Sequence, residues 1–291
     1  MKPNVQSLMR LLATALLTTA ALLLGYSLWA HYMYSPWTRD GRVRAEVVNI
    51  AADVPGLVSG VHVKDNQEVH RGDLLFVIDQ ERFRHALAQA EAQVQARKAE
   101  LDMRRQQAMR RRGLDDSVIS MESQEDTSSQ EKQAKANYEA SLAARDTAKL
   151  NLQRSEVRSP VDGYVTNLNL YAGDYVSAGS ARMAVIDKRS YWVYGYFEET
   201  KLSKVRVGAA VEIRLLSGGD PLKGHVESIA RGIADRDNPT SANLLADVNP
   251  VFTWIRLAQR VPVRIHLDNL PDDLPLAMGT TCTVTVVSTQ R

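Results

Sequence analysis

Two stretches of this chain repeat one another and decide its fold. The first is Val54-Pro55-Gly56-Leu57-Val58-Ser59-Gly60-Val61, and the second is Pro160-Val161-Asp162-Gly163-Tyr164-Val165. Valines that alternate with small or polar residues, between turns of Gly and Asn, are typical of short strands. Each stretch is too short to bury a sheet face alone, so we expect two half-sheets that fold against one another.

The spacing of glycines supports this repeat, because 16 residues separate the equivalent glycines in each half. We expect structural turns at Gly56, Gly72, Gly163 and Gly179. The closing triplets, Val77-Ile78-Asp79 and Val185-Ile186-Asp187, match when one residue is inserted in the second half. Residues 63–69 are expected to form a hairpin turn between two strands. The halves therefore extend over residues 51–79 and 157–187.

A polar insert, residues 80–156, separates the two halves. It contains no proline and a single glycine, Gly113. Apolar residues recur every seven positions on both arms, at Leu87, Val94, Leu101 and Ala108 and then at Ala136, Ala143, Leu150 and Val157. A seven-residue period predicts a long antiparallel α-helical coiled-coil hairpin. An arm from Gln80 to Gly113 would be roughly 50 Å long, at about 1.5 Å per residue.

Charge changes sign near the middle of this insert. Seven basic residues lie between Arg97 and Arg112, and six acidic residues without a basic one lie between Asp115 and Glu131. Cations at the end of one helix and carboxylates at the start of the next both complement the helix dipoles. The pattern therefore predicts the hairpin turn near residues 114–119, with Ser120 as an N-cap.

The N-terminal part of the chain contains a candidate membrane anchor. Residues 11–30 carry no charge and, as a helix, would span about 30 Å, the thickness of a hydrocarbon core. A secretory signal peptide is the alternative, but its apolar region is usually shorter, about 7–15 residues. We expect one transmembrane helix over residues 11–30, preceded by a cytoplasmic N-terminus over residues 1–10. Flanking basic residues on both sides leave the orientation undecided by charge.

The C-terminal third is strand-like and predicts a small antiparallel β-barrel. Residues 188–291 are assigned to the barrel and its membrane-proximal region, and residues 31–50 to a linker and the first barrel strand. The strand candidates are residues 43–50, 191–197, 211–216, 224–229, 261–267 and 281–287. The alternating rings Trp192, Tyr194 and Tyr196 share one face of a strand. We expect this aromatic stripe to be barrel core or a domain interface rather than a platform for cargo.

Composition and motifs exclude several classes of function. A net charge of +2 argues against a strongly basic nucleic-acid binder, and one cysteine, Cys282, excludes an intramolecular disulfide and Cys-based metal frameworks. The chain has no Gly-x-Ser-x-Gly, Gly-x-Gly-x-x-Gly, P-loop or His-Glu-x-x-His motif, and its six histidines are scattered. We therefore expect no catalytic residue, no metal, no cofactor and no nucleic-acid partner.

The split repeat around a helical insert resembles the split biotinyl/lipoyl-like domain of HlyD-type periplasmic adaptors, also called membrane fusion proteins. A true lipoyl or biotinyl carrier protein holds its modified lysine in the hairpin that joins the two halves. Here the insert occupies that junction, and the tempting pair Asp187-Lys188 follows the second half. The resemblance implies a membrane-anchored α+β fold with one transmembrane helix, a β-barrel, a split lipoyl-like β-sandwich and a coiled-coil hairpin.

Four further segments resemble the AaeA-type subunits of p-hydroxybenzoic acid (aromatic carboxylic acid) efflux pumps. They are Ser35-Pro36-Trp37-Thr38-Arg39-Asp40, Asp65-Asn66-Gln67, Glu199-Thr200-Lys201-Leu202 and Leu257-Ala258-Gln259-Arg260-Val261-Pro262-Val263-Arg264-Ile265. This resemblance implies a non-enzymatic adaptor in the inner membrane of a Gram-negative cell, single-pass, with its bulk in the periplasm. Its implied partners are an inner-membrane aromatic-acid exporter, a TolC-like outer-membrane channel and further copies of itself in a homo-oligomeric ring.

The predicted hairpin tip also resembles the channel-docking signature of these adaptors. Arg110, Leu114 and Ser120 fill the positions of its Arg, Leu and Ser, and the gap from Leu to Ser is one residue shorter than in that signature. The resemblance implies that these residues contact the outer-membrane channel. A role as simple caps of the hairpin is the alternative. Among functions, an adaptor of a type I protein-secretion or multidrug efflux system remains open, as does a lipoyl or biotinyl carrier.

Overall fold

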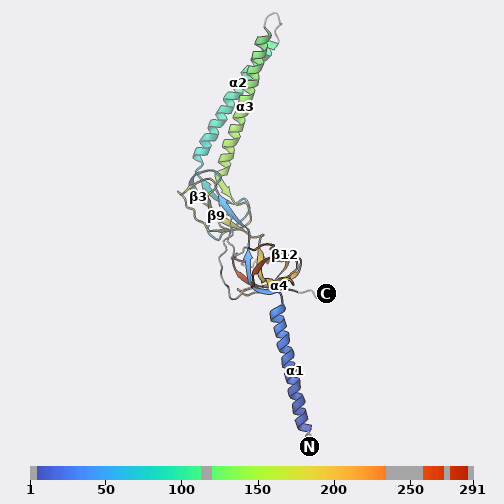
Figure 1. Ribbon diagram of the computed structural model, residues 1–291. Helices are drawn as coiled ribbons and strands as arrows, with labels where there is room; N and C mark the ends of the chain where they lie inside the picture. The colour runs from blue at the N-terminus through green and yellow to red at the C-terminus, as the bar shows by residue number, and fades with distance from the viewer. Residues whose placement is uncertain (1–4, 113–119, 234–257, 272–275, 288–291) are drawn as a thin grey trace, which may run out of the picture. The chain divides into compact units, whose positions relative to one another are not determined.

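The computed structural model describes residues 5–112, 120–233, 258–271 and 276–287. The chain divides into two compact units, one of residues Val47–Arg189 and the other of Met1–Glu46 together with Ser190–Arg291. The first unit holds a β-sandwich and two long helices, and the second holds a barrel and the N-terminal helix (Figure 1). The predicted barrel, sandwich and N-terminal apolar helix are confirmed.

The sandwich consists of two four-stranded sheets that each take strands from both halves of the repeat. Its strands are β2 (Val47–Ala51), β3 (Gly56–Val61), β4 (Glu68–Val69), β5 (Leu74–Ile78), β6 (Glu156–Arg158), β7 (Gly163–Thr166), β8 (Tyr175–Val176) and β9 (Ala181–Asp187). One sheet has the order β2-β9-β7-β4 and the other β6-β5-β3-β8. Inward-facing residues of both sheets form one apolar core. Neither half therefore completes a sheet alone.

Strand pairing repeats with a constant offset along the chain. Val58 pairs with Ile78 in the first half, and Val165 pairs with Val185 in the second, so equivalent residues lie 107 positions apart in both pairs. The prediction that the closing triplets match through an inserted residue is therefore wrong, because Ile78 corresponds to Val185 rather than Ile186. Ile78 and Val185 are both fully buried. Equivalent positions in the two halves must both be buried, whereas their exposed neighbours need not be alike. Burial therefore defines the equivalence of the halves better than the repeated Val-Ile-Asp triplet does.

The expected hairpin over residues 63–69 is also wrong. A turn is present, with Asn66 at φ 62°. However, β3 pairs with β5 and β8, whereas β4 pairs with β7 in the other sheet. The chain thus crosses from one sheet to the other at this turn, because β4 pairs with β7 of the second half, in the sheet that β3 does not join.

The four repeat glycines serve two different purposes. Gly72 and Gly179 lie in turns with φ of 96° and 77°, a region that favours glycine. Gly56 and Gly163 instead begin strands β3 and β7, so their prediction as turns is wrong. A Cβ on Gly163 would lie 1.9 Å from the carbonyl oxygen of Ile186. Close packing of backbone, rather than backbone conformation, requires glycine at this position.

The predicted first barrel strand over residues 43–50 is divided between the two units. Strand β1 (Trp37–Arg44) starts earlier and belongs to the barrel, whereas β2 pairs with β9 in the sandwich. Residues 47–50, which were expected in the linker and first barrel strand, thus belong to the sandwich. Burial alternates along β2 and along residues 41–44 of β1. The two segments are therefore alike in pattern, and pattern alone does not show which sheet each one joins.

The barrel is closed by six antiparallel strands among the described residues. In spatial order they are β1, β10 (Trp192–Glu198), β13 (Arg260–Leu267), β12 (Leu222–Ile229), β11 (Ala210–Leu215) and β14 (Thr281–Val286). A short helix, α4 (Glu199–Leu202), follows β10. Val193, Gly195 and Phe197 are the buried residues of β10. The aromatic stripe of Trp192, Tyr194 and Tyr196 is half-buried on the other face. Of its two expected places, the barrel core is therefore wrong, and a domain interface stays a prediction.

The insert forms two long helices, α2 (Glu81–Arg112) and α3 (Met121–Arg154), which pack side by side (Figure 1). The 32 residues of α2 give a length of about 48 Å. Buried residues recur every seven positions on each helix, at Val94, Leu101 and Ala108 and at Thr127, Ala134 and Ser141.

The predicted contact line of the second arm is therefore wrong. Ala136 and Ala143 are exposed, and Leu150 is 43% exposed. The α3 residues that face α2 are small or polar, so a search for apolar residues at every seventh position does not find them. A close approach of the two helices selects small side chains there rather than apolar ones.

The N-terminal helix α1 (Val5–Tyr34) contains the expected apolar segment. Within the described part of the chain, Met9–Trp29 is long and apolar enough to cross a membrane, with a mean hydropathy of 1.8. Most of its described side chains are leucines and other apolar residues, and they are exposed. An exposed apolar helix of this length suits a lipid environment.

Candidate functional site

The end of the helical hairpin carries the predicted docking residues. Arg110 lies in the last turn of α2 and is exposed. Its Nε donates to the carbonyl oxygen of Gln106 on the same helix, at 3.3 Å. Ser120 is exposed and is the N-cap of α3, where its hydroxyl accepts a hydrogen bond from the backbone N–H of Ser123. Leu114 lies outside the described residues. The structure therefore places two of the three predicted residues at adjoining helix ends.

Two neighbouring arginines, which the sequence reasoning did not single out, fasten these helix ends. Arg111 donates to the hydroxyl of Thr127, at 2.6 Å, and Arg112 forms an ion pair of 2.8 Å with Glu131. Both acceptors belong to α3. The sequence signal for these contacts is the run of three arginines at residues 110–112, but it does not show which of them face α3. Among the described contacts, those of Arg110 stay on its own helix, so its guanidinium remains accessible.

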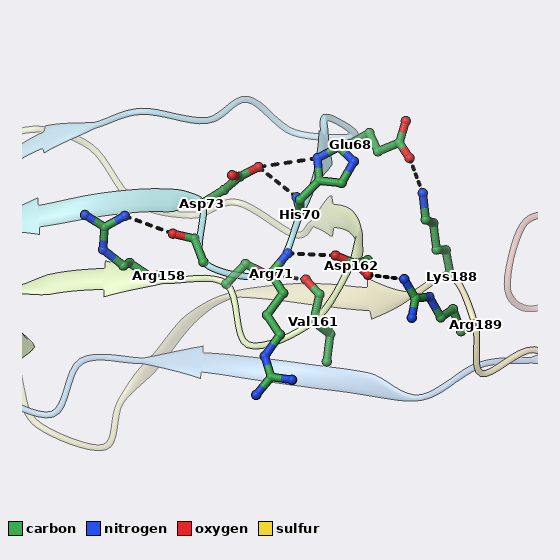
Figure 2. A network of polar contacts seen from close by, with 11 residues as sticks. Glu68, His70, Arg71, Asp73, Arg158, Val161, Asp162, Lys188 and Arg189 are labelled. Carbon is green, nitrogen blue, oxygen red and sulfur yellow. Dashed lines mark hydrogen bonds and ion pairs between the residues drawn. The ribbon is translucent and has the colours of Figure 1, made fainter.

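A second candidate site is a polar network where the two halves of the repeat meet (Figure 2). The Nζ of Lys188 donates to a carboxylate oxygen of Glu68, at 2.7 Å. Asp162 accepts from the backbone N–H of Arg71, at 2.8 Å, and from the guanidinium of Arg189, at 2.6 Å. Each contact of Glu68 or Arg71 thus joins the first half of the repeat to a residue after the insert.

These contacts shift the pKa values of the groups involved. The hydrogen bond from Lys188 lowers the pKa of Glu68 and, reciprocally, raises the pKa of Lys188. The backbone N–H of Arg71 lowers the pKa of Asp162. The ion pair of Glu68 with Lys188 and the hydrogen bond from the backbone of Arg71 to Asp162 therefore connect the two halves. Lys188 is therefore an ion-pair partner in this structure, which suits a structural lysine better than a carrier lysine.

Two family models match the chain. The model of the AAEA-like beta-barrel domain matches residues 190–287, and the model of the RND MFP barrel-sandwich hybrid domain matches residues 46–188. The boundary between the two matches agrees with the division of the structure near residue 189. Each unit thus has its own family assignment.

A close relative covers almost the whole chain. The uncharacterized protein YdhJ of Escherichia coli (strain K12) is 43% identical over 274 residues, which is 94% of this chain and 96% of YdhJ. The likeness extends over both compact units.

Solved structures share the fold at low sequence identity. The membrane fusion protein Spr0693 from Streptococcus pneumoniae R6 has a TM-score of 0.62 and 17% identity, covering 86% of this chain and 98% of Spr0693. A MacA–MexA chimeric protein with the α-hairpin domain of Pseudomonas aeruginosa MexA has a TM-score of 0.57 and 22% identity, covering 87% and 82%. The family matches and the full-length relative agree with this fold. The chain therefore belongs to the membrane fusion proteins, the non-enzymatic periplasmic adaptors of tripartite efflux, and it has an AAEA-like barrel.

Proposed function

We propose that this adaptor serves a pump that exports aromatic carboxylic acids such as p-hydroxybenzoate. The observation that carries the proposal is the AAEA-like barrel over residues 190–287. The same barrel contains β1 and β13, which include parts of the segments that resemble aromatic-acid efflux subunits. An inner-membrane aromatic-acid exporter would be the partner that supplies the energy for transport.

The membrane helix supports a location at the inner membrane. Helix α1 would anchor the chain by a single span, with the sandwich, barrel and hairpin in the periplasm. Its length and apolar surface suit a hydrocarbon core of about 30 Å. A protease-accessibility assay on spheroplasts tests this placement, because a periplasmic barrel would be cleaved without lysis of the inner membrane.

The hairpin would reach a TolC-like outer-membrane channel as part of a ring of several copies. A rigid spacer of about 48 Å with an exposed arginine at its end suits this task. Arg110, Leu114 and Ser120 are the residues that we assign to the channel contact. Arg111 and Arg112 would keep the helix ends in register while Arg110 meets the partner.

Sensitivity to p-hydroxybenzoate tests the proposed cargo. A strain that lacks the gene should be hypersensitive, and a plasmid copy of the wild-type gene should restore growth. The tip variant Arg110→Glu should fail to restore growth, as should Leu114→Asp. Lys98→Glu, a charge reversal at an exposed position within α2, is the matched control and should restore growth. Unchanged sensitivity of the deletion strain would remove the aromatic acid as cargo.

A multidrug efflux adaptor is the alternative, because residues 46–188 match a sandwich domain of the RND type. Hypersensitivity of the deletion strain to unrelated drugs, without a change for p-hydroxybenzoate, would favour this alternative. In that case the adaptor role and the tip contact would stand, and only the cargo would change.

A further inference from the structure

The barrel has a surface pocket of about 290 Å³ beside strand β1. We call it the barrel-edge pocket, and its lining residues are Trp37, Thr38, Arg39, Asp40, Tyr196, Glu198, Lys201 and Arg260. Its volume lies near the lower end of the range for small-molecule sites, roughly 300–1,000 Å³. Three of the four segments that resemble aromatic-acid efflux subunits contribute to this lining. Residues far apart in the sequence therefore converge here.

An irregularity in β1 forms one wall of this pocket. The ladder between β1 and β10 covers Gly41–Arg44, and the pairing of β1 with β14 shifts register between Thr38 and Gly41. The hydroxyl of Thr38 donates to the backbone carbonyl of Tyr196 instead, at 2.7 Å, and accepts from the N–H of Asp40. Bulges of this kind redirect side chains and are common beside binding sites.

Two cations lie against one aromatic ring in the pocket. The Nζ of Lys201 is 5.2 Å from the ring centroid of Trp37, and the guanidinium carbon of Arg39 is 5.5 Å from it. Both distances are within the range of cation–π attraction, about 6 Å. The side chain of Lys201 is only 15% exposed, and its ion pair with Glu198 is long, at 3.6 Å. A largely desolvated ammonium with a distant partner attracts a further anion strongly.

The lining has an excess of one positive charge. Arg39, Lys201 and Arg260 face two carboxylates, Asp40 and Glu198. Asp40 is occupied by an ion pair with Arg260. Among the described residues, no carboxylate lies within ion-pair distance of Arg39. One monovalent anion would therefore balance the charge of the pocket.

We propose that the barrel-edge pocket binds a small aromatic carboxylate. The carboxylate would lie toward Lys201 and Arg39, and the ring would pack against Trp37 and Tyr196. One carboxylate supplies the single negative charge that the lining lacks, and one ring matches the aromatic wall. This inference rests on the proposed function for the choice of ligand, and it adds that the adaptor itself contacts the cargo.

An anion without a ring is the competing occupant, because a phosphate group would also be attracted by these cations. Phosphate carries more than one negative charge at neutral pH and offers no apolar surface to Trp37. The pocket should therefore prefer p-hydroxybenzoate to inorganic phosphate, and also to benzyl alcohol, which has the ring without the charge. These two probes separate the contributions of charge and ring.

The test is a ligand-observed NMR titration of the purified full-length protein in detergent micelles. Lys201→Met should raise the Kd for p-hydroxybenzoate by about tenfold or more, because it removes a charge-assisted hydrogen bond. Arg39→Gln changes an exposed side chain and keeps the test available if Lys201→Met fails to fold. Arg214→Gln, which removes an arginine paired with Glu212 on β11 outside the pocket, is the matched control and should leave Kd unchanged.

Each outcome separates this site from the proposed export function. A Kd that rises in each pocket variant that folds and stays unchanged in Arg214→Gln supports the site, even if the growth assay removes p-hydroxybenzoate as exported cargo. No binding to the wild-type protein, or binding that both pocket variants retain, overturns the site and leaves the growth assay to judge export. Equal affinity for inorganic phosphate or for benzyl alcohol overturns the aromatic carboxylate as its ligand.

Discussion

Among the glycines of the described residues, Gly163 leaves the least room for a side chain. Gly163→Ala should lower the free energy of unfolding by about 3 kcal/mol, because a Cβ would overlap the carbonyl oxygen of Ile186. Gly60→Ala is the matched control in a strand of the same sandwich, since its nearest contact would be an ordinary 3.6 Å. Thermal melts of the two variants followed by circular dichroism test this. Equal melting temperatures would contradict the close approach.

The charged residues of the polar network predict a dependence of stability on pH. The folded-state pKa values of Glu68 and Asp162 lie below their ordinary values, so both groups stabilise the folded state when ionised. That stabilisation is present above the ordinary values of 4.5 and 3.8 and is lost as pH falls through the lowered ones. The melting temperature of the sandwich should therefore fall in acid, and added salt should reduce the effect.

A substitution separates this network from general acid denaturation. Glu68→Gln should lower the melting temperature at pH 7 and make the remaining dependence on acid shallower, because the pair with Lys188 is lost. Glu91→Gln, at an exposed position of α2, should leave the pH profile unchanged. Identical profiles for Glu68→Gln and the wild type would show that the pair is fully screened by solvent.

At the scale of elements, α3 packs against α2 through a narrow line of small residues. Ala134 is 4% exposed on this line, whereas Ala136 is exposed. Ala134→Glu should destabilise the hairpin by about 3 kcal/mol, because it places an unpaired carboxylate between the helices. Ala136→Glu should be tolerated. Loss of helical signal at 222 nm on heating distinguishes them, and equal loss in both would place the contact line elsewhere.

At the scale of the whole molecule, the helical hairpin is an insertion into a sandwich whose ends lie together. The backbone N–H of Ile78 donates to the carbonyl oxygen of Ser155, at 2.8 Å, and the side chain of Gln80 donates to the hydroxyl of Ser155, at 3.2 Å. A short flexible linker can therefore replace residues 81–154 without separating β5 from β6.

The shortened chain should keep its fold and lose its function. Its circular dichroism should show a β-rich protein with a cooperative melt, because both sheets retain all of their strands. It should fail to restore growth in the p-hydroxybenzoate assay, because the spacer and its tip are absent. An unfolded product would show that helix packing, rather than strand pairing alone, stabilises the sandwich.

Much of this architecture follows from local sequence pattern. The long uncharged run predicts α1, the polar insert free of proline predicts α2 and α3, and alternating valines predict the short strands, because these signals depend on neighbours along the chain. Predicted barrel strands after residue 190 lie within a few residues of the observed ones. The segments that resemble known efflux adaptors indicate the family without reference to strand pairing.

Strand pairing and helix contacts join residues far apart in the chain, and these follow only from the tertiary structure. Strands of similar composition can join either sheet, so only folding decided that β2 leaves the barrel and that β3 and β4 separate. The residues of α3 that pack against α2 include Thr127 and Ser141. Because both are polar, a search for regularly spaced apolar residues does not find them.

The barrel-edge pocket likewise combines features that follow from the sequence with contacts that only the fold produces. The sequence alone determined the N-terminal apolar helix, the repeat and the presence of Trp37, Lys201 and Arg260 in recognisable segments. Only the tertiary structure decided that these three residues line one pocket, because long-range strand pairing sets such contacts. The spacing of apolar residues along the chain shows which face of an element a residue occupies. The element that packs against that face is decided by the free energy of the whole fold.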